Sequence, residues 1–258
     1  MRKLLFATVF LVLAGHSKGQ QSPVILSGRI IFEEKARIEL KIDGDTKGIA
    51  NALPKERKSE KILTFNDDAT LFVNGVENAE DEMMQGHSGN NVRVRMIVSS
   101  GENKIYTDLK KRIITEQRDF MNRIFLVERK MPDENWKISG EQKVILGYRC
   151  LQASMQDTSG TVIKVWFTPD IKISSGPAGL GNLPGMILEA DISNGARNYT
   201  AISIHPAEDV IKIEKPKEGK EVTESEYKKI VAQKMEEMDM EQGGNGEGAQ
   251  MQIIIRHQ

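Results

Sequence analysis

The chain is poor in the residues that build covalent or metal frameworks, with one cysteine, Cys150, and four histidines among 258 residues. A single cysteine excludes a disulfide framework within the chain. Neither sign of charge dominates, because 36 basic and 37 acidic side chains give a formal net charge of −1. Since there is also no basic stripe, the sequence argues against nucleic acid and against anionic lipid as electrostatic partners.

Long apolar runs are also missing beyond the first 19 residues. A helix needs about 20 consecutive apolar residues to span a bilayer. We therefore expect no transmembrane segment in the mature chain.

The N-terminus has the pattern of a secretory signal peptide. Arg2 and Lys3 precede a short apolar run at residues 4–14, and Ser17 and Gly19 are small residues at the −3 and −1 positions of a cleavage site before Gln20. No cysteine is available there for lipidation. We predict a signal peptide at residues 1–19 and a location in the periplasm or outside the cell.

Nucleophilic hydrolysis has few candidate residues. His16 belongs to the leader, His87 lies in a polar stretch, and neither His205 nor His257 has an evident catalytic partner. The Gly-x-Ser-x-Gly motif of many hydrolases is absent. Cys150 lies in an apolar, alternating stretch, which predicts a buried cysteine that packs as a small hydrophobic side chain. We predict a protein that is not an enzyme, while a carboxylate pair stays open because pairing is invisible in sequence.

Most of the mature chain has the pattern of short β-strands. Alternating or continuous apolar runs separated by turn residues predict strands. The predicted strands are residues 24–32, 37–42, 61–65, 70–73, 92–98, 104–108, 111–116, 123–130, 136–139, 142–148, 150–156, 161–168, 186–192, 199–205 and 210–214. This spacing predicts a mainly β fold, an antiparallel curved sheet or half-barrel.

One amphipathic C-terminal helix completes the predicted fold. Thr223 and Glu226 form a capping box that marks its start. An apolar stripe then follows at helical spacing, formed by Tyr227, Ile230, Val231, Met235 and Met238. We expect a single β-rich domain at residues 20–240, with a flexible loop at 75–91 and a flexible tail at 241–258.

The most distinctive segment is a glycine- and proline-rich loop at residues 176–185, here called the glycine-rich loop. It joins the predicted strand ending at Thr168 to the apolar run that begins at Met186. One interpretation is a wide connection that redirects the chain into the next strand. The other is a preformed rim around an apolar groove, presenting Leu180, Leu183 and Met186. It is not a phosphate-binding loop, because no Lys-Ser/Thr pair follows the glycines.

Leu183-Pro184-Gly185-Met186-Ile187 resembles the motif that names the GLPGLI family of Bacteroidetes proteins, with Asn182 in place of the usual glycine. Further segments are similar to that family around Trp136, Cys150 and Trp166. The resemblance implies an exported protein of a family without an established biochemical activity.

Three functional hypotheses follow. The first is non-catalytic binding of an apolar ligand or an outer-membrane protein partner, without a cofactor. The expected groove or structural residues are Trp166, Gly176, Pro177, Leu183, Pro184, Gly185 and Met186. The second is a copper protein, because Met83, Met84 and His87 combine thioether and imidazole ligands that suit Cu(I). The third is a hydrolase without a recognisable motif.

Overall fold

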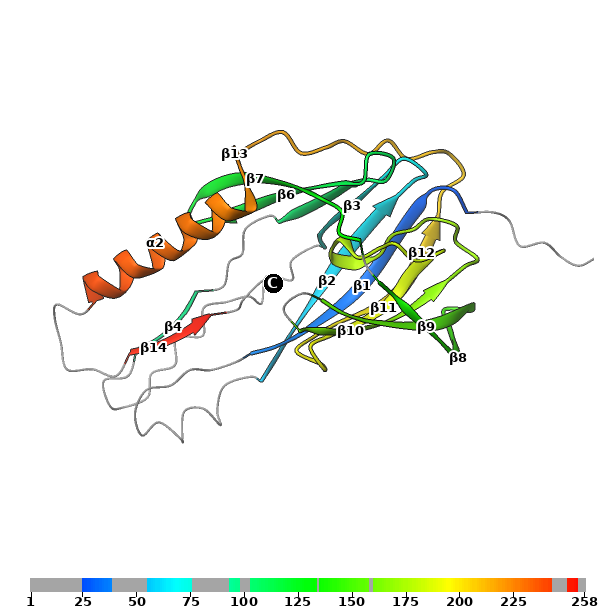
Figure 1. Ribbon diagram of the computed structural model, residues 1–258, viewed down its shortest axis with the longest axis horizontal. Helices are drawn as coiled ribbons and strands as arrows, with labels where there is room; N and C mark the ends of the chain where they lie inside the picture. Colours follow the sequence, from blue (N-terminus) through cyan, green and yellow to red (C-terminus); the bar gives the residue numbers. More distant parts are fainter. Residues whose placement is uncertain are drawn as a thin grey trace, which may run out of the picture.

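The computed structural model describes residues 25–38, 55–75, 93–97, 103–133, 135–157, 160–242 and 250–254. Most of these residues form one large twisted sheet with a helix near the C-terminus (Figure 1). The prediction of a mainly β fold with a curved sheet and one C-terminal helix is therefore confirmed.

The sheet has twelve strands in the order β13-β7-β6-β5-β3-β2-β1-β12-β11-β10-β9-β8. Every pairing is antiparallel except that of β13 with β7. The strands are β1 (Gly28–Arg37), β2 (Glu56–Phe65), β3 (Ala69–Asn74), β5 (Lys104–Asp108), β6 (Ile113–Phe120), β7 (Arg123–Lys130), β8 (Lys137–Ile145), β9 (Tyr148–Gln156), β10 (Val162–Thr168), β11 (Met186–Ile192), β12 (Arg197–Pro206) and β13 (Lys220–Val222). A separate two-stranded parallel sheet pairs β4 (Arg93–Ile97) with β14 (Gln250–Ile254).

The core lies on the concave side of the large sheet, where the glycine-rich loop covers it. Phe32, Leu63 and Phe167 are fully buried there. The loop, which includes the short 3₁₀ helix η1 (Pro177–Gly179), belongs to the same core, since Leu183 is buried with these side chains. Just before the loop, the Ser175 hydroxyl donates to Thr70 Oγ1 of β3 at 3.2 Å. The concave face is thus occupied by the chain itself.

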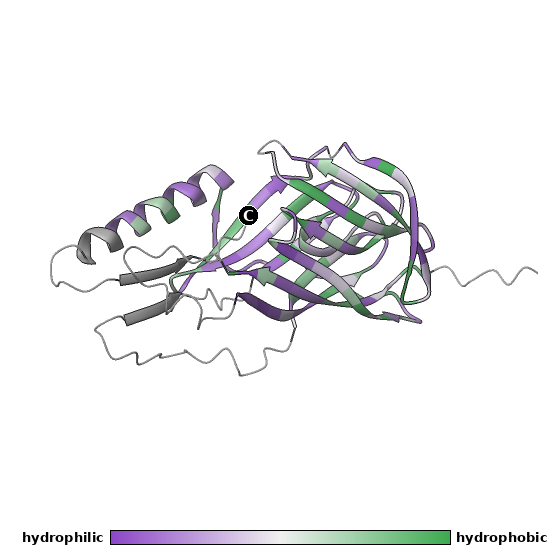
Figure 2. Cartoon of the chain, turned by 90° about the horizontal axis from the view of Figure 1, so that it is seen from below, coloured by the Kyte–Doolittle hydropathy of each residue, from purple (hydrophilic) through white to green (hydrophobic). Residues whose placement is uncertain are grey.

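Several predicted boundaries were wrong. The strand predicted at residues 61–65 begins earlier than expected, because β2 already starts at Glu56 and pairs with β1 over its whole length. The two strands predicted at 136–148 are one strand, β8, with an irregularity between Ile138 and Gln142. Figure 2 shows hydrophilic and hydrophobic residues mixed along many strands, which blurs such boundaries in the sequence.

The strand predicted at residues 210–214 is absent. That segment belongs to an extended connection from β12 to β13. Its backbone bonds to side chains instead of a neighbouring strand: Ile211 N donates to Ser27 Oγ at 2.9 Å, and Asn66 Nδ2 donates to the Ile211 carbonyl at 2.9 Å. An apolar run that finds side-chain partners need not enter the ladder.

The helix α2 (Glu224–Gln242) begins where the capping box predicts. Thr223 N donates to Glu226 Oε2 at 2.7 Å, and Glu226 N donates to Thr223 Oγ1 at 3.2 Å. Tyr227 packs edge-on against Phe125 of β7, with ring centroids 5.5 Å apart. Its stripe residues Ile230, Val231 and Met235 are only half-buried, and Figure 2 shows a mostly hydrophilic helix.

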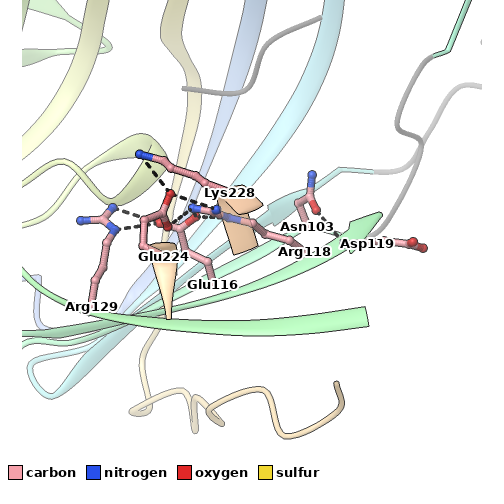
Figure 3. A network of polar contacts seen from close by, with 7 residues as sticks. All are labelled: Asn103, Glu116, Arg118, Asp119, Arg129, Glu224 and Lys228. Atoms are coloured by element: carbon pink, nitrogen blue, oxygen red, sulfur yellow. Dashed lines mark hydrogen bonds and ion pairs between the residues drawn. The ribbon is translucent and has the colours of Figure 1, made fainter. Parts of the chain in front are cut away.

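A charged network fastens the first turn of α2 to the sheet (Figure 3). The Glu116 carboxylate of β6 lies 2.7 Å from Arg118 Nη2 and 3.0 Å from Arg129 Nη2. Arg118 also pairs with Glu224 of the helix, at 3.1 Å. Arg118 therefore links a carboxylate on the sheet to one on the helix, and Arg129 binds the carboxylate on the sheet.

Within the described residues, no helix is both long and apolar enough to cross a membrane. Residues 1–24, which include the predicted signal peptide, lie outside the described residues, and so does most of the predicted loop at 75–91. The predicted tail at 241–258 contains strand β14.

Candidate functional site

A depression of about 250 Å³, lined by polar and apolar side chains, lies where the turns at one end of the sheet meet the glycine-rich loop. The turn between β2 and β3, the turn between β5 and β6, the chain after β7 and the segment entering the loop all contribute to it. Its lining residues are Asp67, Leu109, Arg112, Met131, Lys172, Ile173, Ser174 and Asn182. We call this site the Arg112 depression.

Asn182 joins the segments that form this depression. Its Oδ1 accepts a hydrogen bond from Arg112 Nη1 at 2.8 Å, and its Nδ2 donates to the Pro132 carbonyl at 2.6 Å. The other terminal nitrogen of Arg112 pairs with Asp133 at 3.0 Å. The guanidinium group therefore has two partners, Asn182 and the exposed Asp133, which orient a planar donor group in the lining of the depression.

Arg112 and Asn182 both have left-handed backbone conformations, with φ of 57° and 60°. Asparagine tolerates this region, whereas for arginine it costs about 1 kcal/mol relative to the ordinary helical region. Arg112 closes the β5–β6 turn, where a glycine would avoid that cost. Residues that adopt a conformation for which glycine would be more favourable are typical of functional sites.

The depression also contains polar groups that are not used by the fold. Among the described residues, neither Lys172 nor Ser174 has a side-chain hydrogen bond or ion pair. Lys172, Ser174 and Asp67 are exposed, while Met131 and Ile173, which also line the depression, are buried. An apolar floor with a few convergent donors and acceptors suits a small polar ligand that has an apolar face.

The residues predicted from the glycine-rich loop lie mainly in the core. Leu183 is 2% exposed, Met186 is fully buried, and Pro177 is also buried. Gly185 has a φ of 155°, and a Cβ atom there would lie 2.0 Å from the Thr168 carbonyl oxygen. These residues determine the backbone path of the loop and its packing in the core. Of the two interpretations of the loop, the wide structural connection accounts for them.

Other loop residues are divided between core and surface. Gly176 approaches β11 so closely that a Cβ atom would lie 2.7 Å from Ile187 Cβ. Pro184 is exposed. The loop is further anchored by Trp136, whose Nε1 donates to the Gly181 carbonyl at 2.9 Å.

Trp166 lies away from the Arg112 depression, on the same face of the sheet as Glu189, its neighbour on β11. The ammonium group of Lys143 lies 4.4 Å from the Trp166 ring centroid and also pairs with Glu189 at 2.7 Å. Trp166 is partly buried and packs against the core that contains Leu183 and Met186, but it does not line the Arg112 depression.

Met83, Met84 and His87 lie outside the described residues, so the copper hypothesis keeps the status of a prediction. Among the residues that are described, no group of three or more His, Cys, Asp or Glu side chains is arranged to hold a metal ion.

His205 is exposed at the end of β12, with Nε2 3.1 Å from Ser203 Oγ. Burial raises the pKa of the Cys150 thiol to about 11, as expected for an unreactive core cysteine.

A second polar cluster surrounds Glu34 on β1, which is 8% exposed. Its carboxylate lies 3.2 Å from Lys61 Nζ and 3.4 Å from Arg197 Nε. It also accepts hydrogen bonds from Ser59 Oγ and Tyr199 Oη, each at 2.9 Å. Burial alone would raise the pKa of Glu34, but the two cations and two hydroxyls together lower it. The network is internally satisfied and joins β1, β2 and β12.

Sequence reasoning did not find the Arg112 depression. Arg112 and Lys172 lie in segments without a motif, and Asn182 was noted only as a substitution in the glycine-rich loop, 70 positions from Arg112. One signal was available: Asn182 interrupts a run of glycines, and asparagine is the residue that best replaces glycine in left-handed conformations while adding a hydrogen-bonding side chain.

Comparison with solved structures finds similar folds in two crystal forms of PNGF-II. The structure in space group C2 is 20% identical with a TM-score of 0.52, covering 80% of this chain and 32% of the other. The structure in space group P2₁ is 19% identical with a TM-score of 0.52, covering 80% and 33%. The chain thus spans about a third of the PNGF-II chains, and at this identity the likeness shows the fold alone. No curated protein matches the chain by sequence.

A family model described as "N-glycanase peptide, N-terminal domain" matches residues 93–229. This match overturns the GLPGLI assignment and the prediction of a non-catalytic protein for apolar ligands. The structure supplies a physical reason, because Leu180, Leu183 and Met186, which were expected to be presented to an apolar ligand, are buried in the core. The prediction that the protein is not an enzyme is also wrong, since the matching family takes its name from an N-glycanase. With more than half of its residues matched, the chain belongs to the family of N-glycanase N-terminal domains.

Proposed function

We propose that this chain takes part in the cleavage of N-linked glycans and that the Arg112 depression binds the carbohydrate of the substrate. The observation that carries the proposal is the fixed Arg112 guanidinium beside the unused groups of Lys172 and Ser174. All the lining residues except Asp67 fall within the segment that matches the N-glycanase family.

The chemistry of the depression fits a sugar better than an apolar ligand. Sugar hydroxyls both donate and accept hydrogen bonds, and the lining offers a carboxylate, an ammonium group, a guanidinium group and a hydroxyl. Hydrogen bonds to charged groups contribute about 1.5–3 kcal/mol each. The volume of about 250 Å³ is below the range typical of drug-sized ligands, which favours a single sugar unit of a larger chain.

The test is calorimetric titration of the full chain with a peptide that carries an N-linked glycan and with the same peptide lacking it. We expect heat of binding only with the glycopeptide. Lys172→Ala should weaken binding about tenfold, the value of one charged hydrogen bond. Lys164→Ala is the matched control, because Lys164 is an exposed lysine on β10 outside the depression. Equal affinity for both peptides would refute the proposal.

An activity measurement accompanies the titration. Release of free glycan from the glycopeptide, followed by mass spectrometry, should fall in the Lys172 variant in parallel with binding. Release that is unchanged by Lys172→Ala would place the carbohydrate elsewhere on the molecule.

We also propose export to the periplasm or beyond, with residues 1–19 as the signal peptide and residues 20–240 as one domain. The charged start, the short apolar run and the small residues before Gln20 support this. N-terminal sequencing of the mature protein should begin at Gln20. The binding proposal involves no cofactor and no nucleic acid.

A further inference from the structure

Asn182 is the residue through which three separate segments contact one another at the Arg112 depression. It belongs to the glycine-rich loop, and its side chain reaches the β5–β6 turn through Arg112 and the chain after β7 through Pro132. Both polar atoms of its amide are engaged in these contacts, at 2.8 and 2.6 Å. The orientation of the amide is therefore set by protein contacts, with one N–H and one lone pair of the oxygen outside them.

The backbone at Asn182 does not itself require asparagine. At a φ of 60°, glycine would be at least as comfortable. Asn182 is half-buried and lies between Gly181 and Leu183, which are both buried. The surrounding loop therefore sets the backbone position of Asn182. Its side chain adds the hydrogen bonds to Arg112 and to the Pro132 carbonyl.

We propose that Asn182 is a positioning residue that sets carbohydrate affinity by holding the Arg112 guanidinium group in place. This inference rests on the proposed function of the depression. Without Asn182 Oδ1, the guanidinium group keeps only Asp133, which is fully exposed and gives a weak, mobile pairing. A side chain with several rotatable bonds then loses conformational freedom on binding the sugar, which lowers the affinity.

The chain offers a matched pair of glycine substitutions for the test. Asn182→Gly retains the left-handed backbone and removes both hydrogen bonds. Asn194→Gly makes the same change at an exposed turn residue with a φ of 50°, away from the depression. Both variants and the wild type are titrated with the N-glycopeptide and with the unglycosylated peptide, and their thermal unfolding is recorded.

We expect Asn182→Gly to weaken glycopeptide binding about fivefold to tenfold, with an unfolding temperature close to that of the wild type. Asn194→Gly should bind like the wild type. In the Arg112→Ala background, Asn182→Gly should cause no further loss, because the asparagine acts through that arginine.

Other results would overturn the inference. If the wild type binds the glycopeptide and Asn182→Gly binds it equally well, the positioning role fails while the proposed function stands. A full additional loss in the Arg112→Ala background would show that Asn182 does not act through Arg112. If the wild type does not distinguish the two peptides, both proposals fail.

A second variant keeps the test decisive if the glycine variant does not fold. Asn182→Asp loses the donor to the Pro132 carbonyl but retains an oxygen acceptor for Arg112, so through that arginine it should bind within about twofold of the wild type. Binding as weak as that of Arg112→Ala would contradict the proposed role.

Discussion

Replacing Glu34 by alanine should strongly destabilise the fold. The carboxylate is 8% exposed and lies between Lys61 and Arg197, whose side chains are each 15% exposed. Removing it leaves two largely buried like charges facing each other without the carboxylate between them, although Lys61 keeps its hydrogen bond to Asn74. Breaking a buried ion pair in this way costs about 3–5 kcal/mol. For a chain of this size, that corresponds to a fall in the unfolding temperature on the order of 10 °C.

The assay is urea unfolding at pH 7, followed by circular dichroism, with Glu33→Ala as the control. Glu33 is the neighbouring residue on β1 and pairs with Lys35 and Lys58 at the surface. Exposed pairs contribute about 0–1 kcal/mol, so this control should barely change the free energy of unfolding. A Glu34→Ala variant within about 1 kcal/mol of the wild type would refute the reasoning.

The pH dependence of Glu34 has a definite sign. Its pKa in the folded chain is lowered from the reference value of 4.5, so the folded state favours the carboxylate. The stabilisation is fully present above pH 4.5 and is lost as the pH falls through the folded-state pKa. The difference in unfolding free energy between the wild type and Glu34→Ala should therefore shrink below pH 4.5. A difference that grows on acidification would contradict this account.

Three further predictions concern local features. Gly185→Ala should lower the free energy of unfolding by more than about 3 kcal/mol, because the methyl group would lie 2.0 Å from the Thr168 carbonyl oxygen. Wild-type stability of this variant in urea unfolding would contradict the prediction. Cys150 should resist iodoacetamide at pH 8 in the native state and react in urea, because the thiol is buried and burial raises its pKa to about 11. Labelling is followed by mass spectrometry. Rapid labelling of the native protein would show that the core is open to the reagent. Thr223→Ala should destabilise the first turn of α2 by about 1 kcal/mol, seen as faster amide exchange there, and unchanged exchange would show that the cap is dispensable.

Local patterns in the sequence predicted the strands well where one face is buried and turn residues are clear. The predicted ranges 104–108, 123–130 and 186–192 coincide with β5, β7 and β11. The helix start was equally clear, because a capping box is a contact between residues three positions apart. These features depend on neighbours in the sequence and can therefore be read from it.

The order of the strands could not be predicted in the same way. The sheet places β1 between β2 and β12, so that Phe32 pairs with Ala201. Nothing in the local pattern of either strand identifies its distant partner. The Arg112 depression has the same origin, since its residues come from turns that meet only after these pairings form.

The glycine-rich loop packs into the core at most positions and forms side-chain hydrogen bonds to two other segments at Asn182. Gly185 allows the backbone to lie directly against Thr168, where any side chain would collide. Asn182 has a conformation that would also suit glycine, yet it carries a side chain that binds Arg112. Backbone preference therefore does not explain asparagine at this position, whereas its hydrogen bonds do. For this reason we place recognition at the margin of the loop, where a polar side chain replaces glycine, and not on the apolar face that the loop buries.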